Sequence, residues 1–472
     1  PIVAAGDGSA RPHAKARENY RVKAGDALLI DFGSTFTKLR AVDLDTSEII
    51  GSGQGPSTVA TDVTDGLHAA LGDFENQIGD LPEFEHRLAC SSAAGGLGMV
   101  TVGLVRELTA EAAKQAALGA GAKLTGAFSY GLTPDDITEI EAQAPDIILL
   151  AGGTDGGNAD VILENAGRLA ASAVACPIVV AGNREATPDA QAVLEKAGKP
   201  VTATANVMPE FGTLDVEPAR DAIRKVFIDR IVHAKGIDRA SDMFDAVLMP
   251  TPAAVLDGAK LLSDGLPVIP GLGDLVVVDV GGATTDVHSV ASGAPTVEGA
   301  IQHGLPEPHC KRSVEGDLGM RVNAHSIAEA AGLDVIAAAA GVNVGRAGEM
   351  LDTLSGDIEH LPKAGSEEAR FDQALAATAL GLAVTRHAGS LSIVQMVTGP
   401  ASVQTGKDLS AVGTLIGTGG VLAQGENPAA TLAAGLADSA QPQSLKPKAP
   451  ALLLDSECVL YALFRNPLRH HP

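Results

Sequence analysis

The chain has 472 residues, enough for two or three domains with a large core, and 45% of its residues are hydrophobic. Its formal net charge of -24 argues against nucleic acid or an anionic membrane as the main partner, because both need basic patches. Nucleotide binding stays open, since backbone amides and a metal ion can hold phosphates.

The cysteines and the hydropathy pattern indicate an intracellular setting. Four cysteines stand far apart without a CxxC pair, which argues against a zinc site or an iron–sulfur cluster within the chain. No apolar run reaches the length of a membrane span, and no signal-peptide pattern is visible. We therefore expect a cytoplasmic protein with reduced thiols.

The first block predicts an arm followed by a strand-rich domain. Residues 1–25 are polar and punctuated by Gly and Pro, which favours a flexible arm, with a basic docking tail as the alternative. Residues 26–144 form the first predicted domain. It has strand-like segments at 27–31, 37–43, 48–55 and 86–92 and a helical pattern at 109–119.

A second block, residues 145–273, alternates apolar strands with helical patterns. The strands are "PDIILLAGG", "PIVVAGN" and "PVTATANV", and the helical patterns cover 158–174, 187–198 and 222–232. This alternation predicts a doubly wound parallel insertion with connecting helices. The turn "AGGTDGGN", residues 151–158, is either an anion-binding nest or a tight strand-to-helix turn.

A third block, residues 274–437, is predicted to be a second domain. It contains Ala-rich helical residues 324–341, a helix at 367–388 and the strand and Gly turn "AVGTLIGTGGVLA". Residues 438–450 have the composition of a linker, and residues 451–472 are predicted to return to the body as a strand and a short helix.

The first and third blocks share one strand–turn–strand pattern. "LLIDFGSTFTKLRAV" (28–42) aligns without gaps on "VVVDVGGATTDVHSV" (276–290). Small turn residues let backbone amides approach an anion, and an Asp at a strand end can hold Mg²⁺ or orient a water. One such hairpin is common in sheets, but two facing hairpins would clamp one polyphosphate. The aligned pairs are Asp31 with Asp279, Gly33 with Gly281, Ser34 with Gly282, Thr35 with Ala283, and Lys38 with Asp286.

A third element follows in "TLIGTGGVLA", residues 414–423. Gly417, Gly419 and Gly420 stand after an apolar strand and before a helix, where backbone can lie flat against a nucleobase or ribose. These three elements in this order resemble the actin, sugar-kinase and heat-shock-chaperone ATPase superfamily. The resemblance implies an α/β fold of two ribonuclease-H-like domains with a nucleotide cleft between them.

Six stretches in order are similar to the glutamate mutase L family, also called MutL or GlmL. They are "DFGSTFTK", "SSAAGGLGMV", "ILLAGGTDGGN", "VVDVGGATTDVHSV", "VEGDLGMR" and "IGTGGVLAQGENP". The resemblance implies ATP and Mg²⁺ as cofactors and an accessory ATPase that acts on an adenosylcobalamin-dependent mutase or aminomutase, as a reactivating chaperone or assembly factor. The alternatives are a small-molecule kinase of the same fold and a nucleotide-dependent scaffold, and a homodimer stays open.

The resemblance also implies roles for individual residues. Asp31 would stand near the metal, and Asp279 would be either the second carboxylate beside the metal or the one that positions the attacking water. Glu315 would be a further candidate to polarise that water. Glu315 has an alternative interpretation as a carboxylate at a helix start. The implied phosphate and nucleotide contacts are Gly33, Ser34, Thr35, Lys38, Gly281, Gly282, Thr284, Asp286, Gly417, Gly419 and Gly420.

Two other sites are not predicted. The sequence lacks the combined Asp-x-His-x-x-Gly pattern of a cobalamin-binding domain. His303 and His309 stand near Cys310 at a spacing that suggests metal ligands, but no second cysteine is close enough to complete a site.

Overall fold

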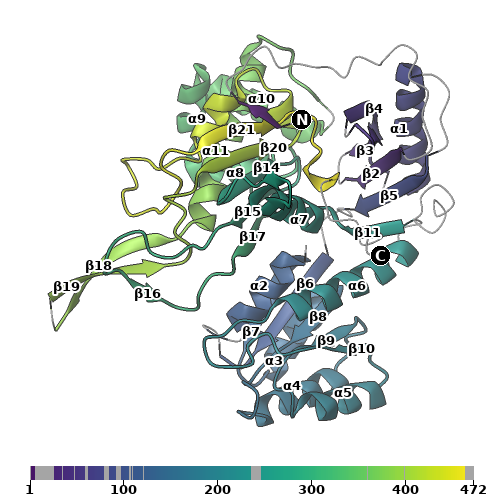
Figure 1. Cartoon of the computed structure of the whole chain (residues 1–472), viewed down its shortest axis with the longest axis vertical. Helices are drawn as coiled ribbons and strands as arrows, with labels where there is room; N and C mark the ends of the chain where they lie inside the picture. The colour runs from purple at the N-terminus through teal and green to yellow at the C-terminus, as the bar shows by residue number, and fades with distance from the viewer. Residues whose placement is uncertain are drawn as a thin grey trace.

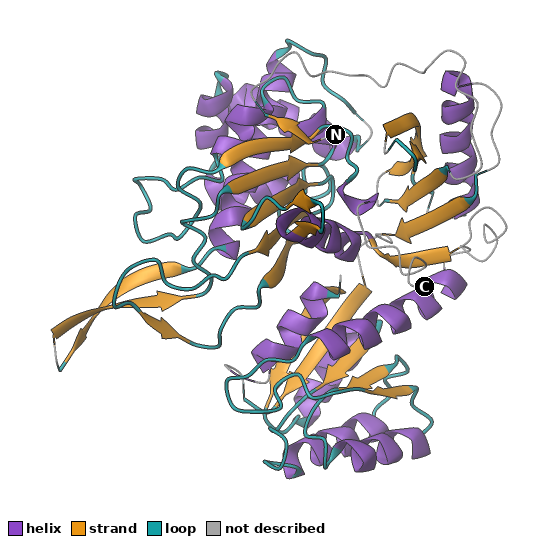
Figure 2. Ribbon diagram, viewed as in Figure 1, coloured by secondary structure: helices purple, strands orange, loops and turns teal. Residues whose placement is uncertain are grey.

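The structure, a computed structural model, is a mixed α/β protein built on three large sheets (Figures 1 and 2). It describes residues 2–5, 26–33, 36–46, 48–58, 62–78, 84–91, 97–105, 108, 110–120, 122–234, 246–358, 360–397 and 399–462. Within these residues, no helix is both long and apolar enough to cross a membrane.

The first sheet has the strand order β11-β5-β2-β3-β4. Strand β3 runs antiparallel to β2 and β4, while β2, β5 and β11 are parallel, and helix α1 (Val63–Ile78) packs against β3 and β4. The strands are β2 (Ala27–Phe32), β3 (Phe36–Asp43), β4 (Glu48–Pro56), β5 (His86–Ser91) and β11 (Ala246–Pro250).

The second sheet repeats this arrangement. Five of its six strands stand in the order β17-β15-β14-β20-β21, where β15 is antiparallel to β14 and β17, and β14, β20 and β21 are parallel. The strands are β14 (Leu275–Val280), β15 (Thr285–Val290), β17 (Cys310–Glu315), β20 (Thr414–Thr418) and β21 (Ala451–Asp455). Two sheets with one shared order and direction pattern confirm the predicted pair of ribonuclease-H-like domains.

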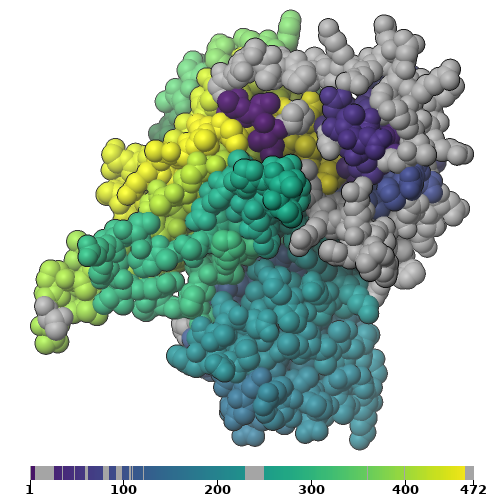
Figure 3. Space-filling model, viewed as in Figure 1, coloured from purple at the N-terminus to yellow at the C-terminus, as the bar shows by residue number. Residues whose placement is uncertain are grey.

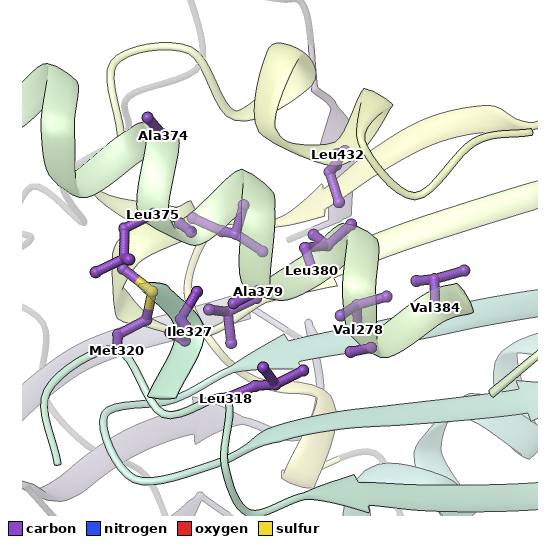
Figure 4. Close-up of a cluster of buried hydrophobic side chains, with 14 of the residues drawn as sticks. Val278, Leu318, Met320, Ile327, Ala374, Leu375, Ala379, Leu380, Val384 and Leu432 are labelled. Atoms are coloured by element: carbon purple, nitrogen blue, oxygen red, sulfur yellow. The ribbon is translucent and has the colours of Figure 1, made fainter. Parts of the chain in front are cut away.

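Helices cover the second sheet and bury its apolar face. Figure 4 shows Val278 of β14 facing Leu380 and Val384 of the long helix α11, with Leu318 and Ile327 beside them. The helices of this domain are α8 (Ala324–Ala331), α9 (Leu333–Ala340), α10 (Val344–Gly356), α11 (Glu367–His387), α12 (Gly420–Ala423) and α13 (Pro428–Ala433).

The third sheet is entirely parallel, with the order β10-β9-β8-β6-β7, and forms the doubly wound insertion. Its strands are β6 (Leu97–Gly103), β7 (Ala122–Ser129), β8 (Ile147–Leu150), β9 (Ile178–Val180) and β10 (Val201–Ala203). Its helices are α2 (Glu111–Gly119), α3 (Pro134–Gln143), α4 (Asp160–Ala171), α5 (Thr187–Lys196) and α6 (Glu217–Ala234).

The predicted boundaries of the insertion need correction at both ends. The boundary between residues 144 and 145 is wrong, because β6 and β7 pair with β8 and so belong to the insertion. The boundary at residue 273 is also wrong, because β11 pairs with β5 and returns the chain to the first sheet. Helix α7 (Thr251–Asp264) and the short hairpin of β12 (Gly265–Leu266) and β13 (Ile269–Pro270) follow it.

Helix α7 lies between the two ribonuclease-H-like sheets (Figure 1). Its buried residues Ala254, Val255 and Ala259 belong to one apolar cluster with Leu29 and Leu88 of the first sheet. The same cluster contains Leu275, Val277 and Val290 of the second sheet. The two domains therefore share a core at their junction.

The chain ends differ from their predictions in part. Within the predicted arm, strand β1 (Ile2–Ala4) pairs antiparallel with β21, while residues 6–25 lie outside the described residues. The predicted linker, 438–450, packs on the body, where Leu445 and Lys446 are buried. After β21 the chain ends its described part in a 3₁₀ turn, Leu460–Ala462.

Candidate functional site

A cleft of about 870 Å³ opens between the two ribonuclease-H-like domains, and both repeated hairpins line it. Most of the predicted site residues meet there. Ser34 and Thr35 lie outside the described residues. The predicted residues that line the cleft are Asp31, Gly33, Lys38, Asp279, Gly281, Gly282, Thr284, Asp286, Gly419 and Gly420.

The two hairpin turns close with the same backbone hydrogen bond. Gly33 N–H donates to Phe36 O at 3.1 Å, and at the aligned positions Gly281 N–H donates to Thr284 O at 2.9 Å. A Cβ at Gly33 would collide with the Phe36 carbonyl oxygen, and one at Gly281 would stand 2.9 Å from the Thr284 oxygen. Glycine is thus required in both turns by close backbone approach.

Asp31 lies near the end of β2, opposite Lys38 of β3. Its carboxylate accepts a hydrogen bond from Thr251 Oγ1 at 2.7 Å and one from Cys90 Sγ at 3.5 Å. Burial raises the pKa of Asp31, and Lys38 offsets part of that rise. Asp31 is thus fixed in orientation at the floor of the cleft.

Asp279 occupies the equivalent place on β14, opposite Asp286 of β15. Among the described residues, its side-chain carboxylate accepts no hydrogen bond, unlike that of Asp31. Burial, and then the negative charge of Asp286, raise the pKa of Asp279 to about 7. Burial acts to lower the pKa of Lys38, but nearby acidic groups, Cys458, Asp31 and Asp279, give a net rise. Lys38 thus interacts with both aspartates across the cleft.

Asp286 is anchored from two sides. Thr284 Oγ1 donates to its Oδ2 at 2.9 Å, and Arg312 Nη2 and Nε donate to its Oδ1 at 2.6 and 2.9 Å. Arg312 Nη1 also donates to the carbonyl oxygens of Leu118, at the end of α2, and Ala122, at the start of β7. The second turn is therefore tied to the insertion.

The third predicted element is only partly in the cleft. Gly419 has φ +99°, and a Cβ there would collide with Val280 O and lie 3.0 Å from Asp279 Oδ1. Gly420 has open space beside it. The prediction for Gly417 needs correction, because this glycine faces Leu422 and Leu432 in the core and does not line the cleft.

The prediction for Glu315 also needs correction. Glu315 lies on β17 opposite Thr285 and lines a second cavity of about 440 Å³, not the cleft. Arg386 Nη1 donates to its Oε2 at 2.8 Å. Burial raises the pKa of Glu315, and Arg386 partly opposes that rise. Its alternation with Val314 along the strand turns it away from the cleft.

Sequence reasoning missed Lys123, Thr251 and Arg312, which also line the cleft. Lys123 is an exposed residue of β7, and its Nζ would stand 3.6 Å from a Cβ at Gly316. It makes no ion pair with the carboxylates that the structure describes. No local pattern marks any of the three, since each reaches the cleft from a segment far from the hairpins in sequence.

The carboxylates of the cleft fit a metal ion that binds together with a nucleotide better than one held by protein side chains alone. Across the described residues, no group of three or more His, Cys, Asp or Glu side chains could hold a metal ion. Mg²⁺ in nucleotide sites keeps several waters and takes one or two carboxylates together with phosphate oxygens. Asp31 and Asp279, facing one cleft with small-residue turns beside them, match that requirement.

A comparison with protein families matches most of the chain to one family. The MutL protein family matches residues 27–464. The chain belongs to the MutL family. A MutL protein of Clostridium tetanomorphum is 45% identical over 437 residues, covering 92% of this chain and 94% of that protein.

Solved structures similar to this MutL family member match far more weakly. The ethanolamine utilization protein EutJ from Carboxydothermus hydrogenoformans has a TM-score of 0.29 at 10% identity, covering 94% of this chain and 91% of that one. A glycerol dehydratase reactivase has a TM-score of 0.34 at 11% identity, covering 93% and 99%. Because these scores are low, the fold assignment rests on the sheet topology described above.

Proposed function

We propose that this MutL family member binds ATP with Mg²⁺ in the cleft and hydrolyses it. The observation that carries the proposal is the repeated turn. Two hairpins with the same closing hydrogen bond present their small residues and their aspartates to one cleft from opposite domains. Backbone amides in such turns are suited to phosphate oxygens, and neither hairpin alone surrounds a polyphosphate.

The proposal gives each cleft residue a task. Asp31 and Asp279 hold the water shell of the metal or orient the attacking water, and Thr251 keeps the Asp31 carboxylate in place. Lys38 neutralises phosphate charge from the floor, and Lys123 does so from the insertion side. Bound ATP–Mg²⁺ would supply the phosphoryl group that is transferred to water.

We further propose a protein partner, an adenosylcobalamin-dependent mutase or aminomutase that this chain reactivates or assembles. Support comes from membership of the MutL family and from the similarity to the Clostridium tetanomorphum protein. The structure adds a mechanical reason: Arg312 ties the second turn to the insertion, so a change at the cleft reaches a separate domain. A partner bound to the insertion would respond to such a change.

The test is Mg²⁺-dependent phosphate release from ATP, measured with the protein alone and with an inactivated mutase from the same genome. Asp31→Ala and Asp279→Ala are each expected to abolish turnover while thermal unfolding stays cooperative. Asp73→Asn is the matched control, because Asp73 also lines the cleft but lies outside both hairpins. Equal turnover in the wild type and both alanine variants would refute the site.

The response to the mutase separates the remaining functions. Faster hydrolysis together with recovered mutase activity supports the reactivating chaperone. A rate of ATP turnover that does not change with the mutase but increases with a small-molecule phosphoryl acceptor indicates a kinase of the same fold. Nucleotide binding without any turnover indicates a nucleotide-dependent scaffold, and absence of nucleotide binding refutes the proposal altogether.

A further inference from the structure

A β-arm extends from the second domain, away from the cleft (Figure 3). Its three strands, in the order β16-β19-β18, form a sheet separate from the other described sheets. They are β16 (Ile301–His303), β18 (Ser390–Met396) and β19 (Gly399–Thr405). Figure 1 shows β18 and β19 standing clear of the helices and sheets of the body.

The hairpin of this arm carries no charge. Residues 388–406 contain no Asp, Glu, Lys, Arg or His, although the whole chain has 58 acidic and 34 basic residues. An edge strand in a natural sheet is usually protected by charges or Pro against pairing with another chain. The β18 edge lacks that protection.

One face of the arm is apolar and accessible. The strand register places Val394 opposite Ala401, and Met396 opposite Gly399, on the same face as Val403 and Ile301. Val394 is 42% exposed, Met396 41% and Ile301 46%. A further strand added beside β18 would stabilise this face through side-chain contacts between the two strands.

The outer edge of β18 presents free backbone groups. Leu391 N–H points away from β19, because it donates to Gln443 O at 2.8 Å. Alternate residues of an antiparallel strand direct their N–H and C=O groups to the same side, so those of Ile393 and Gln395 also point outward. Beyond the bridge between Ser390 and Ser444, no strand of the described residues pairs with this edge.

We propose that the occupant of this edge is β18 of a second copy of the chain. The two strands pair antiparallel about a two-fold axis at Val394. Ile393 of each copy then exchanges hydrogen bonds with Gln395 of the other, and the two Val394 side chains face each other. Such an isologous contact satisfies the outward groups of both copies at once and joins their apolar faces into one surface.

The charge distribution makes the arm a better place for a second copy to bind than the acidic surface of the body. Two chains with a net charge of -24 repel each other, and the neutral arm removes that repulsion at the contact. The seven residues of β18 span about 24 Å, well beyond the Debye length of roughly 8 Å at physiological salt. The arms thus hold the acidic bodies apart where their charges are screened.

The first test is the mass in solution, measured by sedimentation across a concentration series. The wild type is expected to be a dimer, and Val394→Glu a monomer, because two carboxylates would meet on the axis. Val344→Glu is the matched control, since Val344 of α10 is 49% exposed and far from the arm in the fold. Circular dichroism confirms that each variant is folded.

A charge-swap and a cross-link then test the register. Val394→Glu mixed with Val394→Lys is expected to form a heterodimer, because only a two-fold at this residue brings the unlike charges together. Val394→Cys is expected to form an oxidised dimer. Ala401→Cys is not, because its two copies would stand three strand spacings, about 14 Å, apart.

Three results would overturn the proposal. The first is a monomeric wild type over the whole concentration series, even if the arm then binds a mutase. The second is a dimer that Val394→Glu and Val344→Glu leave equally intact. The third is equal cross-linking of Val394→Cys and Ala401→Cys, which would place the contact on the face of the arm and not on its edge.

Discussion

Arg312 donates two hydrogen bonds to one oxygen of Asp286, at 2.6 and 2.9 Å, and both residues are buried. The same guanidinium bonds the carbonyl oxygens of Leu118 and Ala122 in the insertion. One side chain therefore connects the turn of the second hairpin to the parallel sheet. The register explains why: Asp286 and Arg312 lie on neighbouring strands, two residues apart along the ladder.

Arg312→Met is expected to destabilise the fold by about 3–5 kcal/mol, because it leaves the Asp286 carboxylate buried without its positively charged partner. The loss is measured by urea unfolding. The double variant Arg312→Met with Asp286→Asn is expected to lose less than the sum of the single variants, since the uncompensated charge is gone. Strict additivity of the two losses would show that the pair contributes no coupling.

Gly33→Ala and Gly281→Ala are each expected to weaken nucleotide binding at least tenfold, because a Cβ would push the closing carbonyl oxygen out of place. Calorimetric titration with a non-hydrolysable ATP analogue measures the loss. Gly72→Ala is the control, since this glycine lies within α1 with open space around its Cα. It is expected to leave binding unchanged and raise stability by up to about 1 kcal/mol. Unaltered affinity in both turn variants would contradict the clamp.

Lys123→Met is expected to slow ATP turnover by about tenfold or more, since a charge contact of about 1.4 kcal/mol corresponds to a factor of ten. The reason is that Lys123 reaches the cleft from β7 without a carboxylate partner among the described residues. Lys196→Met, on the exposed end of α5, removes a charge elsewhere on the insertion. If both variants slow turnover equally, the effect is one of net charge and not of position.

The pH dependence of stability is expected to follow the buried His387. Its Nε2 and Nδ1 stand 2.8 and 2.7 Å from the hydroxyl groups of Ser289 and Ser313. Burial lowers the pKa of His387 well below 6.5, and the neighbouring Lys311, Lys407 and His288 lower it further. The imidazole is therefore neutral in the folded protein at pH values where the unfolded chain takes up a proton.

The direction in which pH changes stability follows from this difference in the pKa of His387 between the folded and the unfolded state. Above pH 6.5 neither state binds the proton, and stability is independent of this group. As the pH falls below 6.5, the unfolded state gains a proton that the folded state excludes, so stability decreases by up to about 1.4 kcal/mol per pH unit. His387→Gln is expected to reduce this slope, measured by urea unfolding between pH 7 and pH 5. An identical slope in the variant would mean that other groups dominate.

The sequence predicts the hairpins because their information is local. An apolar strand, an Asp and a run of small residues are adjacent in the chain, and their repetition about 250 residues later predicts the paired domains. The domain boundaries, in contrast, depend on pairing between strands that are distant in the sequence. Nothing within β6 or β11 shows that the first joins β8 and the second joins β5.

For a similar reason, the sequence indicates only in part which single residues reach the cleft. Gly419 and Gly417 have the same local context, and only the packed side chains of Leu422 and Leu432 show that Gly417 faces the core. Glu315 is the last residue of a strand that borders both cavities, and the sequence of so short a strand does not show which of its residues reach the cleft. That Lys123 and Arg312 lie at the cleft can be known only from the packing of the insertion against β17.

The core shared around α7 determines how the cleft can change shape. Because apolar side chains from both sheets pack on this helix, the two domains stay joined at the floor of the cleft, and separating them would expose a dry interior to water. We therefore expect any relative motion of the two domains to be a rotation about α7. A small rotation about this helix displaces most the parts that lie far from it. The insertion and the β-arm would therefore move farthest if the two domains closed on a ligand.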